Sequence, residues 1–339
     1  MKRVGLIGNF CGDNIGGQAE KTRVLYEFLN KHYDVLKVDV YQLSPIKVLM
    51  YIGRVFLECD RIVVILASPG YFKIQSYLLF CKSLTGAEVY EFVIGGVRYE
   101  YLVGKKRRIC QEKKIKKIYV ESTHMVQEYQ KLGLDNAVYV PNFKVVDRTV
   151  EAKEQRGTEW LRFCTFSRID KYKGIDTAIN IINAVCEKKH IRAELDIIGP
   201  VDKEYEQDFR KLLASADKDR IHYIGSISSK KAVGILSEYD ALLFPTHWEA
   251  EGFPGSFIDA MAAGLPILAT RKENFRDIVK NSYNGWLIDE WDIDGYVEKI
   301  ADFASTPELL IQMRQNAVAE AGKYTVENAL SQVLTDLKR

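Results

Sequence analysis

The sequence predicts an α/β protein made of two doubly wound domains, each built on a parallel sheet. Short apolar runs alternate with helical patterns from the first residues onward, which is typical of parallel strands joined by crossover helices. The alternation stops at a polar stretch and then starts again. A length of 339 residues also suits two domains of ordinary size better than one.

The first domain is predicted to contain six strands. They are the segments 3–8, 35–41, 61–67, 88–93, 117–122 and 136–141. Between the first two of them, residues 18–33 place Val24, Leu25, Phe28 and Leu29 at helical spacing. We therefore expect a crossover helix there.

The second domain is predicted to repeat this arrangement after the polar residues 144–159, which we interpret as a linker. Its strands are expected at 162–167, 193–199, 220–225, 240–245 and 265–270. The C-terminal residues form one more amphipathic helical pattern. We expect an N-terminal domain at residues 1–145, completed by a helix at 324–339, and a C-terminal domain at residues 160–320.

The composition, 47% hydrophobic and 28% charged, is typical of a soluble globular protein. The apolar runs are shorter than the ~20 residues of a membrane helix, and the first run breaks too early for a signal peptide. We therefore expect a cytoplasmic protein, and no nucleic-acid partner. Its six cysteines are widely spaced without a CxxC pair, which favours buried free thiols over a disulfide framework or zinc site.

The net charge of +2 conceals an asymmetry, because residues 1–144 carry +8 and the remainder −6. Much of the excess lies in the basic cluster Lys105–Arg108 and the lysines that follow it. This cluster is either a solvated helix face or a surface that meets an anionic membrane or a phosphate-bearing acceptor. Leu49, Ile52, Val55 and Phe56 would add to a membrane contact if exposed, or form a core helix if buried.

A glycine-rich loop follows the first strand, where parallel-sheet proteins place their ligand crevice. Its spacing does not fit the GxGxxG dinucleotide fingerprint. It does not fit a P-loop either, because Gln18 and Ala19 stand where Lys and Ser or Thr are needed. Gly16 and Gly17 nevertheless allow the main chain to approach a ligand at a helix N-terminus, with a plain tight turn as the alternative.

The segment FPTHWEAEGFPGSFIDAMAAGLPILAT is the most informative part of the chain. A strand ends at Pro245, a loop carries Glu251, and a helix follows that contains Asp259. Glycines at a helix start leave main-chain N–H groups accessible to a diphosphate. A carboxylate can accept two hydrogen bonds from a vicinal diol, which suits sugar and ribose hydroxyls.

This segment resembles the signature of family 4 glycosyltransferases, which have the GT-B architecture of two Rossmann-like domains facing across a cleft. Glu251 matches the first glutamate of their Glu-x7-Glu pattern, and Asp259 replaces the second with a shorter carboxylate. The resemblance implies a nucleotide-sugar donor, transfer with retention of anomeric configuration, and a ribose contact for Asp259. The donor-binding residues that it implies are Gly16, Gly17, Arg168, Lys173, Glu251, Gly252, Phe253, Pro254, Gly255 and Asp259.

Arg168 and Lys173, in RFCTFSRIDKYKGIDTAI, fall on the family's two phosphate-binding cations. The chemistry also favours them without the resemblance, because a leaving nucleoside diphosphate develops negative charge that fixed cations stabilise. We expect Glu251, Arg168 and Lys173 to carry catalysis. Each cation taken alone would more often be a surface charge.

Many relatives place a histidine in the loop after the fourth strand, whereas this chain has Gly95, Gly96 and Arg98 there. We predict these three residues on the acceptor side and assign no catalytic histidine. The pair Asp292 and Asp294 has the DxD spacing that binds metal in other glycosyltransferases. Because a helical pattern follows directly, we interpret it as a helix N-cap and expect no metal or other cofactor beyond the nucleotide sugar.

The expected function is therefore transfer of a hexose-type sugar to a hydroxyl acceptor in bacterial cell-surface polysaccharide assembly. The acceptor would be a glycan or a lipid-linked molecule at the inner face of the cytoplasmic membrane. Two alternatives remain: a nucleotide-sugar epimerase of related fold, and a non-catalytic sugar-binding protein. The sequence leaves open the sugar, the base and the linkage.

Overall fold

The computed structural model describes residues 3–10, 17–146 and 160–338. The chain forms two compact units. The N-terminal unit comprises Met1–Val145, Ala250–Phe253 and Tyr324–Arg339, and the C-terminal unit comprises Val146–Glu249 and Pro254–Lys323. The linker predicted at 144–159 lies almost entirely outside the described residues.

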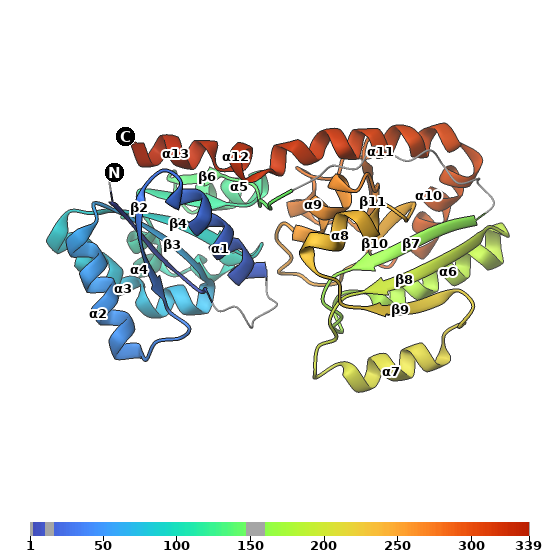
Figure 1. The fold of residues 1–339 in the computed structure, drawn as a ribbon, viewed down its shortest axis with the longest axis horizontal. Helices are drawn as coiled ribbons and strands as arrows, with labels where there is room; N and C mark the ends of the chain where they lie inside the picture. The colour runs from blue at the N-terminus through green and yellow to red at the C-terminus, as the bar shows by residue number, and fades with distance from the viewer. Residues whose placement is uncertain (1–2, 11–16, 147–159, 339) are drawn as a thin grey trace. The chain divides into compact units, whose positions relative to one another are not determined.

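Each unit contains a six-stranded parallel sheet with helices on both faces, which confirms the predicted α/β fold (Figure 1). In the N-terminal unit the order is β2-β1-β3-β4-β5-β6. The strands are β1 (Arg3–Gly8), β2 (Asp34–Asp39), β3 (Arg61–Ala67), β4 (Glu88–Ile94), β5 (Lys117–Val120) and β6 (Ala137–Tyr139). All six were predicted from the sequence, with ends that differ by a few residues.

Two apolar layers cover this sheet because side chains alternate between its faces. On β3, Ile62 and Val64 belong to one layer, and Val63 and Ile65 belong to the other. The first layer packs against α2 to α5 and the second against α1, α12 and α13. The helices are α1 (Gly17–Asn30), α2 (Pro45–Glu58), α3 (Ser68–Thr85), α4 (Lys106–Glu112), α5 (Thr123–Lys131), α12 (Val326–Ala329) and α13 (Ser331–Lys338), with the 3-10 helix η1 (Arg98–Leu102).

The last helices of the chain are part of the N-terminal core. Leu330, Val333 and Leu337 pack with side chains of β1 and α1. The hydroxyl of Tyr119 on β5 also donates a hydrogen bond to Asp336 at 3.1 Å. The amphipathic pattern at the C-terminus therefore finds its apolar partner about 300 residues earlier in the sequence.

In the C-terminal unit the strand order is β12-β11-β10-β7-β8-β9. The strands are β7 (Trp160–Phe166), β8 (Arg192–Ile198), β9 (Ile221–Gly225), β10 (Ala241–Phe244), β11 (Ile267–Thr270) and β12 (Gly285–Ile288). The helices are α6 (Ile175–Lys189), α7 (Glu206–Ser215), α8 (Ser229–Leu236), α9 (Gly255–Ala262), α10 (Ile293–Ser305) and α11 (Pro307–Ala321), with the 3-10 helix η2 (Glu273–Phe275). The strands β8 and β9 follow β7 on one side, whereas β10, β11 and β12 lie on its other side, so the strand order reverses between β7 and β10. A ligand crevice is therefore expected at the carboxyl ends of these two strands.

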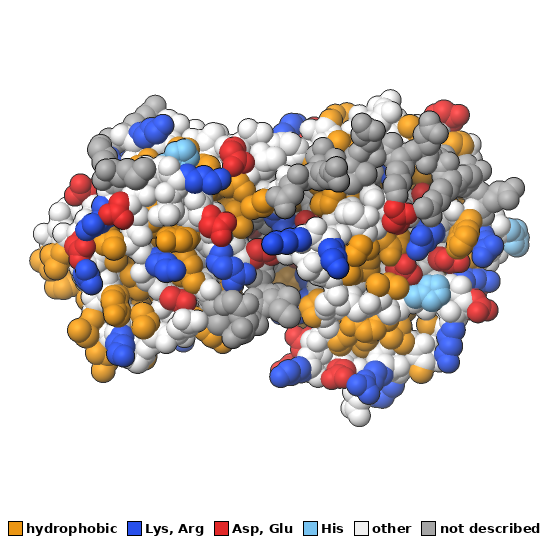
Figure 2. Space-filling model, in the orientation of Figure 1, with side chains coloured by type: hydrophobic (Ala, Val, Ile, Leu, Met, Phe, Trp, Pro, Cys, Tyr) orange, Lys and Arg blue, Asp and Glu red, His pale blue; other side chains and the backbone are white. Residues whose placement is uncertain are grey.

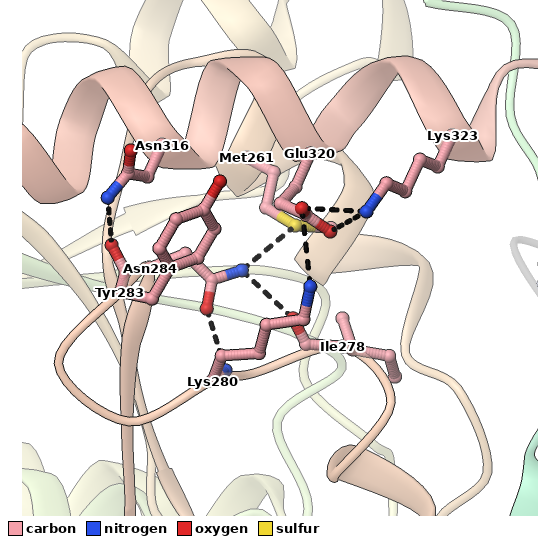
Figure 3. A network of polar contacts seen from close by, with 8 residues as sticks. All are labelled: Met261, Ile278, Lys280, Tyr283, Asn284, Asn316, Glu320 and Lys323. Carbon is pink, nitrogen blue, oxygen red and sulfur yellow. Dashed lines mark hydrogen bonds and ion pairs between the residues drawn. The ribbon is translucent and has the colours of Figure 1, made fainter.

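The edge strand β12 was not predicted. Its four residues are all buried and show no alternation of polar and apolar side chains. Asn284 fixes the turn before it, since its side-chain amide donates to the Ile278 carbonyl at 2.9 Å and its side-chain oxygen accepts from the Lys280 main chain at 2.7 Å (Figure 3). The same amide lies 3.8 Å from the sulfur of Met261 on α9, and Lys280 pairs with Glu320 on α11 (Figure 3).

Candidate active site

In the C-terminal unit, the loop between β7 and α6 packs directly onto the end of β10. Gly174 has a left-handed φ of 67°, and a Cβ there would lie 1.9 Å from the carbonyl oxygen of Pro245. Gly199, directly after β8, packs in a similar way against the main chain after β7, because a Cβ at this position would lie 1.8 Å from the carbonyl oxygen of Ser167. Both positions exclude any larger residue, and they bring the ends of β7, β8 and β10 together.

The two predicted cations lie on this loop. Arg168 is exposed, and its Nε is 3.4 Å from Oδ2 of the buried Asp170. Lys173 is half-buried, with its ammonium 5.6 Å from the ring centre of Phe244 and 5.9 Å from that of Trp248. Both cations therefore lie at the carboxyl ends of the central strands, where the sheet topology places a ligand crevice.

The helix α9 begins in the same unit at Gly255, after Pro254 at its N-cap. Its first amide groups carry the partial positive charge of a helix N-terminus. Asp259, the predicted ribose contact, lies in the middle of this helix and is only 6% exposed.

The other half of the predicted motif, Ala250–Phe253, belongs to the N-terminal unit. The main-chain N–H of Gly96 donates to the carbonyl of Ala250 at 3.2 Å. A Cβ on Gly252 would lie 3.2 Å from the nitrogen of Gly96 and 2.8 Å from Oε2 of Glu121. The structure therefore brings the segment that carries Glu251 against the glycine loop that follows β4.

Two polar residues that the sequence did not single out hold this segment, and a third pairs with one of them. Oε2 of Glu121 accepts a hydrogen bond from the Phe253 main chain at 3.3 Å, and the side-chain amide of Asn142 donates to the Phe253 carbonyl at 2.9 Å. Oε1 of Glu121 pairs with Lys21 on α1 at 2.5 Å, and both side chains are less than 10% exposed. Removing one partner of such a buried pair typically costs about 3–5 kcal/mol of stability.

A sequence signal for these residues does exist in retrospect. Glu121 follows directly on β5, so it lies at the carboxyl edge of a parallel strand. Lys21 lies one helical turn after Gly17, at the start of the helix that follows the glycine loop. Neither residue type is unusual at such a position, however, and only the fold shows that they meet.

Arg98 occupies a different environment from its predicted acceptor role. Its side chain is fully buried between the carboxylates of Glu91 and Glu112 and lies over the ring of Tyr71. Burial raises the pKa of Glu91 to about 8 and also raises that of Glu112, although Arg98 opposes both shifts. The prediction that Arg98 faces an acceptor is therefore wrong for this structure, because the guanidinium is buried in the core and paired with Glu91 and Glu112.

The two glycines of the same loop, Gly95 and Gly96, lie at the end of β4 beside the Ala250–Phe253 segment. Gly17 begins α1, and a Cβ there would meet nothing within 4 Å. Gly16 lies outside the described residues.

His247, which follows β10 by three residues, takes part in a local network. His247 accepts or donates hydrogen bonds with Thr177 at 2.9 Å and Glu290 at 3.0 Å, and its ring stacks on Trp291 at 3.6 Å. Burial opposes ionisation of Glu290, but hydrogen bonds from His247 and Lys272 outweigh it and hold the pKa of Glu290 below its usual value.

The DxD pair is a helix start, as predicted. Asp292 is the N-cap of α10, and its side chain accepts from the Gly295 main chain at 2.9 Å. Asp294 pairs with Lys188 on α6 at 2.6 Å. Across residues 3–10, 17–146 and 160–338, no three His, Cys, Asp or Glu side chains gather as metal ligands would.

Comparison with known proteins places these features in a family. Residues 147–320 match the profile of the family Glycosyl transferases group 1. The putative colanic acid biosynthesis glycosyltransferase WcaL of Salmonella typhimurium is 23% identical over 185 residues, which cover 51% of this chain and 45% of WcaL. The capsular polysaccharide biosynthesis glycosyltransferase CapM of Staphylococcus aureus is 26% identical over 164 residues, which cover 48% of this chain and 40% of CapM.

The fold has solved counterparts too. The crystal structure of Anabaena HepE in complex with UDP matches with a TM-score of 0.76 over all of both chains, at 14% identity. The chain spans about half the length of the curated relatives that it matches. Because the family profile covers more than half of the sequence, the protein belongs to the family Glycosyl transferases group 1.

Proposed function

We propose that this protein transfers a sugar from a nucleotide-diphosphate donor to a hydroxyl acceptor during assembly of bacterial cell-surface polysaccharide. Family membership supports the reaction class. The names of WcaL and CapM, which refer to colanic acid and capsule, support the pathway class. The complex of HepE with UDP supports a uridine nucleotide as the first donor to test.

The observation that carries this proposal is the position of Arg168 and Lys173 on the loop between β7 and α6, at the carboxyl ends of β7 and β10. Gly174 packs this loop tightly against Pro245. Cleavage of a nucleotide-sugar bond leaves negative charge on the diphosphate. Two fixed cations lower the free energy of that charge most when they need no reorganisation, and the tight packing of Gly174 against Pro245 restrains the loop that carries them. The amides at the start of α9 would add to the same stabilisation.

In the same proposal, Glu251 and the main chain of Gly252 and Phe253 position the donor sugar, and Asp259 binds the ribose. Asp259 is 6% exposed, so only a small part of its surface is available to contact a ribose hydroxyl. The transfer proceeds with retention, as expected of a family 4 enzyme, and needs no metal ion. Gly95 and Gly96 line the acceptor side.

A lipid-linked acceptor would bring the protein to an anionic membrane, and two surface features of the N-terminal unit support this. Lys105, Lys106 and Arg107 are exposed at the start of α4. Nearby, the helices α2 and α3 expose a set of large apolar side chains, visible on the N-terminal unit in Figure 2. The most exposed of them are Ile46 (74%), Met50 (68%), Leu57 (81%), Phe80 (57%) and Leu84 (70%).

This apolar face differs from the one suggested by the sequence. Ile52, Val55 and Phe56 are buried under α2, and of the four residues proposed from the sequence only Leu49 is exposed. Arg108 is half-buried with its guanidinium over the ring of Phe72 on α3, so the basic cluster and the apolar face are joined through α3. Cations beside exposed apolar groups suit the boundary between headgroups and acyl chains. No helix of the described residues is long and apolar enough to span a bilayer.

The test starts with thermal unfolding of the protein in the presence of UDP-, GDP-, ADP- and CDP-sugars. A donor at ~100 times its Kd adds about 2.7 kcal/mol of stability and raises the Tm. The stabilising donor is then incubated with and without lipid-linked or glycan acceptors, in buffer and in EDTA, and the anomeric configuration of the product is read by NMR.

Acceptor-dependent release of the nucleoside diphosphate in EDTA, with a retained anomer, is the expected result. Conversion of the donor to an isomer without acceptor would favour the epimerase alternative. Binding without any turnover would favour the sugar-binding alternative. Loss of activity in EDTA that Mn²⁺ or Mg²⁺ restores would contradict the metal-free mechanism.

A further inference from the structure

Glu121 lies where three segments of the N-terminal unit meet, and each of its carboxylate oxygens has a separate partner. Oε1 pairs with the ammonium of Lys21 on α1 at 2.5 Å. Oε2 accepts from the main-chain N–H of Phe253 at 3.3 Å. One buried side chain at the end of β5 therefore links the helix after the glycine loop to the segment that carries Glu251.

The fit of this segment around Glu121 is tight. A Cβ on Gly252 would lie 2.8 Å from Oε2, so a larger residue at this position would have to displace the Glu121 carboxylate. The segment is also held at both ends, by the N–H of Gly96 on the carbonyl of Ala250 and by Asn142 on the carbonyl of Phe253. Within this set of contacts, Glu121 supplies the negative charge.

Lys21 compensates the buried negative charge of Glu121. An ionised carboxylate with 6% residue exposure needs a compensating cation, because desolvation of a lone charge is costly. The ammonium of Lys21 provides it and also lies 5.1 Å from the ring centre of Phe143. A second buried ion cluster of the same unit joins Arg98 with Glu91 and Glu112 and supplies a comparison.

We propose that Glu121, neutralised by Lys21, is a positioning residue that fixes the main chain of Ala250–Phe253, and through it Glu251, in the conformation used for sugar transfer. This inference rests on the proposed function, because it gives Glu251 its role. The effect passes through one hydrogen bond, from the Phe253 N–H to Oε2. Displacing a reacting group by about 1 Å can reduce a rate by about 100-fold, so a small change in this segment is sufficient.

The experiment compares two double variants that differ at position 121, in whether the side chain can accept that hydrogen bond. Lys21→Met/Glu121→Gln removes both charges but keeps a side-chain oxygen that can accept from Phe253. Lys21→Met/Glu121→Leu removes both charges and the acceptor at nearly the same side-chain volume. Neither variant leaves an unpaired buried charge, so differences between them do not come from a broken ion pair.

With the donor and acceptor identified as above, we expect kcat of the Gln variant within about fivefold of the parent, and kcat of the Leu variant about 100-fold lower. KM for the donor should change less than threefold in the Leu variant, on the order expected when ground-state binding is kept. The control Glu112→Gln weakens a buried ion pair formed with Arg98, not with Lys21 or Glu121, and its kcat should stay within about twofold of the parent at a temperature where it is folded. Equal kcat values in the Gln and Leu variants would overturn the proposal.

Amide hydrogen exchange supplies a readout that does not depend on activity. The Phe253 amide should exchange at least tenfold faster in the Leu variant than in the Gln variant, and at the parent rate in Glu112→Gln. If the protein transfers no sugar at all, the proposed function fails while this difference in exchange persists. If the protein is active and both double variants protect Phe253 equally, the positioning role fails while the proposed function stands.

Discussion

At the scale of single residues, Arg168 and Lys173 are expected to stabilise charge on the departing diphosphate. Arg168→Ala and Lys173→Ala should each lower kcat by about 100-fold, the amount typically lost with one transition-state charge stabiliser. The matched control is Arg210→Ala, which removes an exposed cation on α7 that pairs with Glu206 one turn away. Initial rates with saturating donor measure the effect, and near-parent rates for both variants would rule out the phosphate role.

Glu91 is expected to make the stability of the N-terminal unit depend on pH. Burial raises the pKa of its carboxyl from 4.5 to about 8, in spite of Arg98. Between these two values the folded chain holds a proton that the unfolded chain has lost, so this contribution to stability is complete below 4.5 and is lost as the pH rises to about 8. The free energy of unfolding should therefore fall with pH in this window.

Glu91→Gln removes the titrating group, so it should flatten that slope by up to about 1.4 kcal/mol per pH unit between about pH 6 and pH 8. Urea denaturation followed by circular dichroism is the suitable measurement. Tryptophan fluorescence would report on the other unit, because all four tryptophans belong to the C-terminal unit. Glu327→Gln, at an exposed carboxylate, is the control and should keep the parent slope. An unchanged slope in Glu91→Gln would mean that Glu91 is ionised throughout.

At the scale of elements, the loop between β7 and α6 depends on Gly174. Gly174→Ala would strain a backbone at φ 67° and place a methyl group against the carbonyl of Pro245, so the loop must move. We expect a lower Tm and a loss of kcat similar to that of Lys173→Ala, because the neighbouring Lys173 is displaced.

The matched control for this element is Gly234→Ala on α8, where a Cβ would meet nothing within 4 Å. Replacing glycine by alanine inside a helix adds about 0.5–1 kcal/mol of stability, so this variant should unfold at a higher temperature with parent kcat. Parent-like kcat in Gly174→Ala would show that the loop conformation does not matter to the reaction.

At the scale of the whole molecule, the basic cluster and the apolar face of α2 and α3 should bind anionic vesicles. Basic residues near such a surface contribute about 1 kcal/mol each, so changing Lys105, Lys106 and Arg107 to Ser should weaken sedimentation with phosphatidylglycerol vesicles by roughly 100-fold. Ile46→Ser/Leu57→Ser should weaken it as well, with less dependence on salt.

The control for vesicle binding is Arg210→Ser/Lys211→Ser on α7 of the C-terminal unit, which should bind like the parent. Vesicles of phosphatidylcholine alone should bind the parent weakly. Absence of binding by the parent, or binding that neither set of variants nor added salt changes, would leave the basic cluster as a solvated helix face.

The sequence by itself determined the fold class, because alternating strand and helix periods depend only on local order along the chain. Among the described residues it predicted every strand except β12, and it predicted the N-cap role of Asp292. The segment around Glu251 and Asp259 predicted a glycosyltransferase, and the match to Glycosyl transferases group 1 confirms that class. The strand β12 was missed because its four buried residues show no alternation of polar and apolar side chains.

Tertiary structure decided which polar side chains meet. It buried Arg98 between Glu91 and Glu112, and it brought Lys21, Glu121 and Phe253 together from positions up to 232 residues apart. Such contacts are set by the carboxyl edge of a parallel sheet, where residues distant in sequence become neighbours, and no local pattern encodes them.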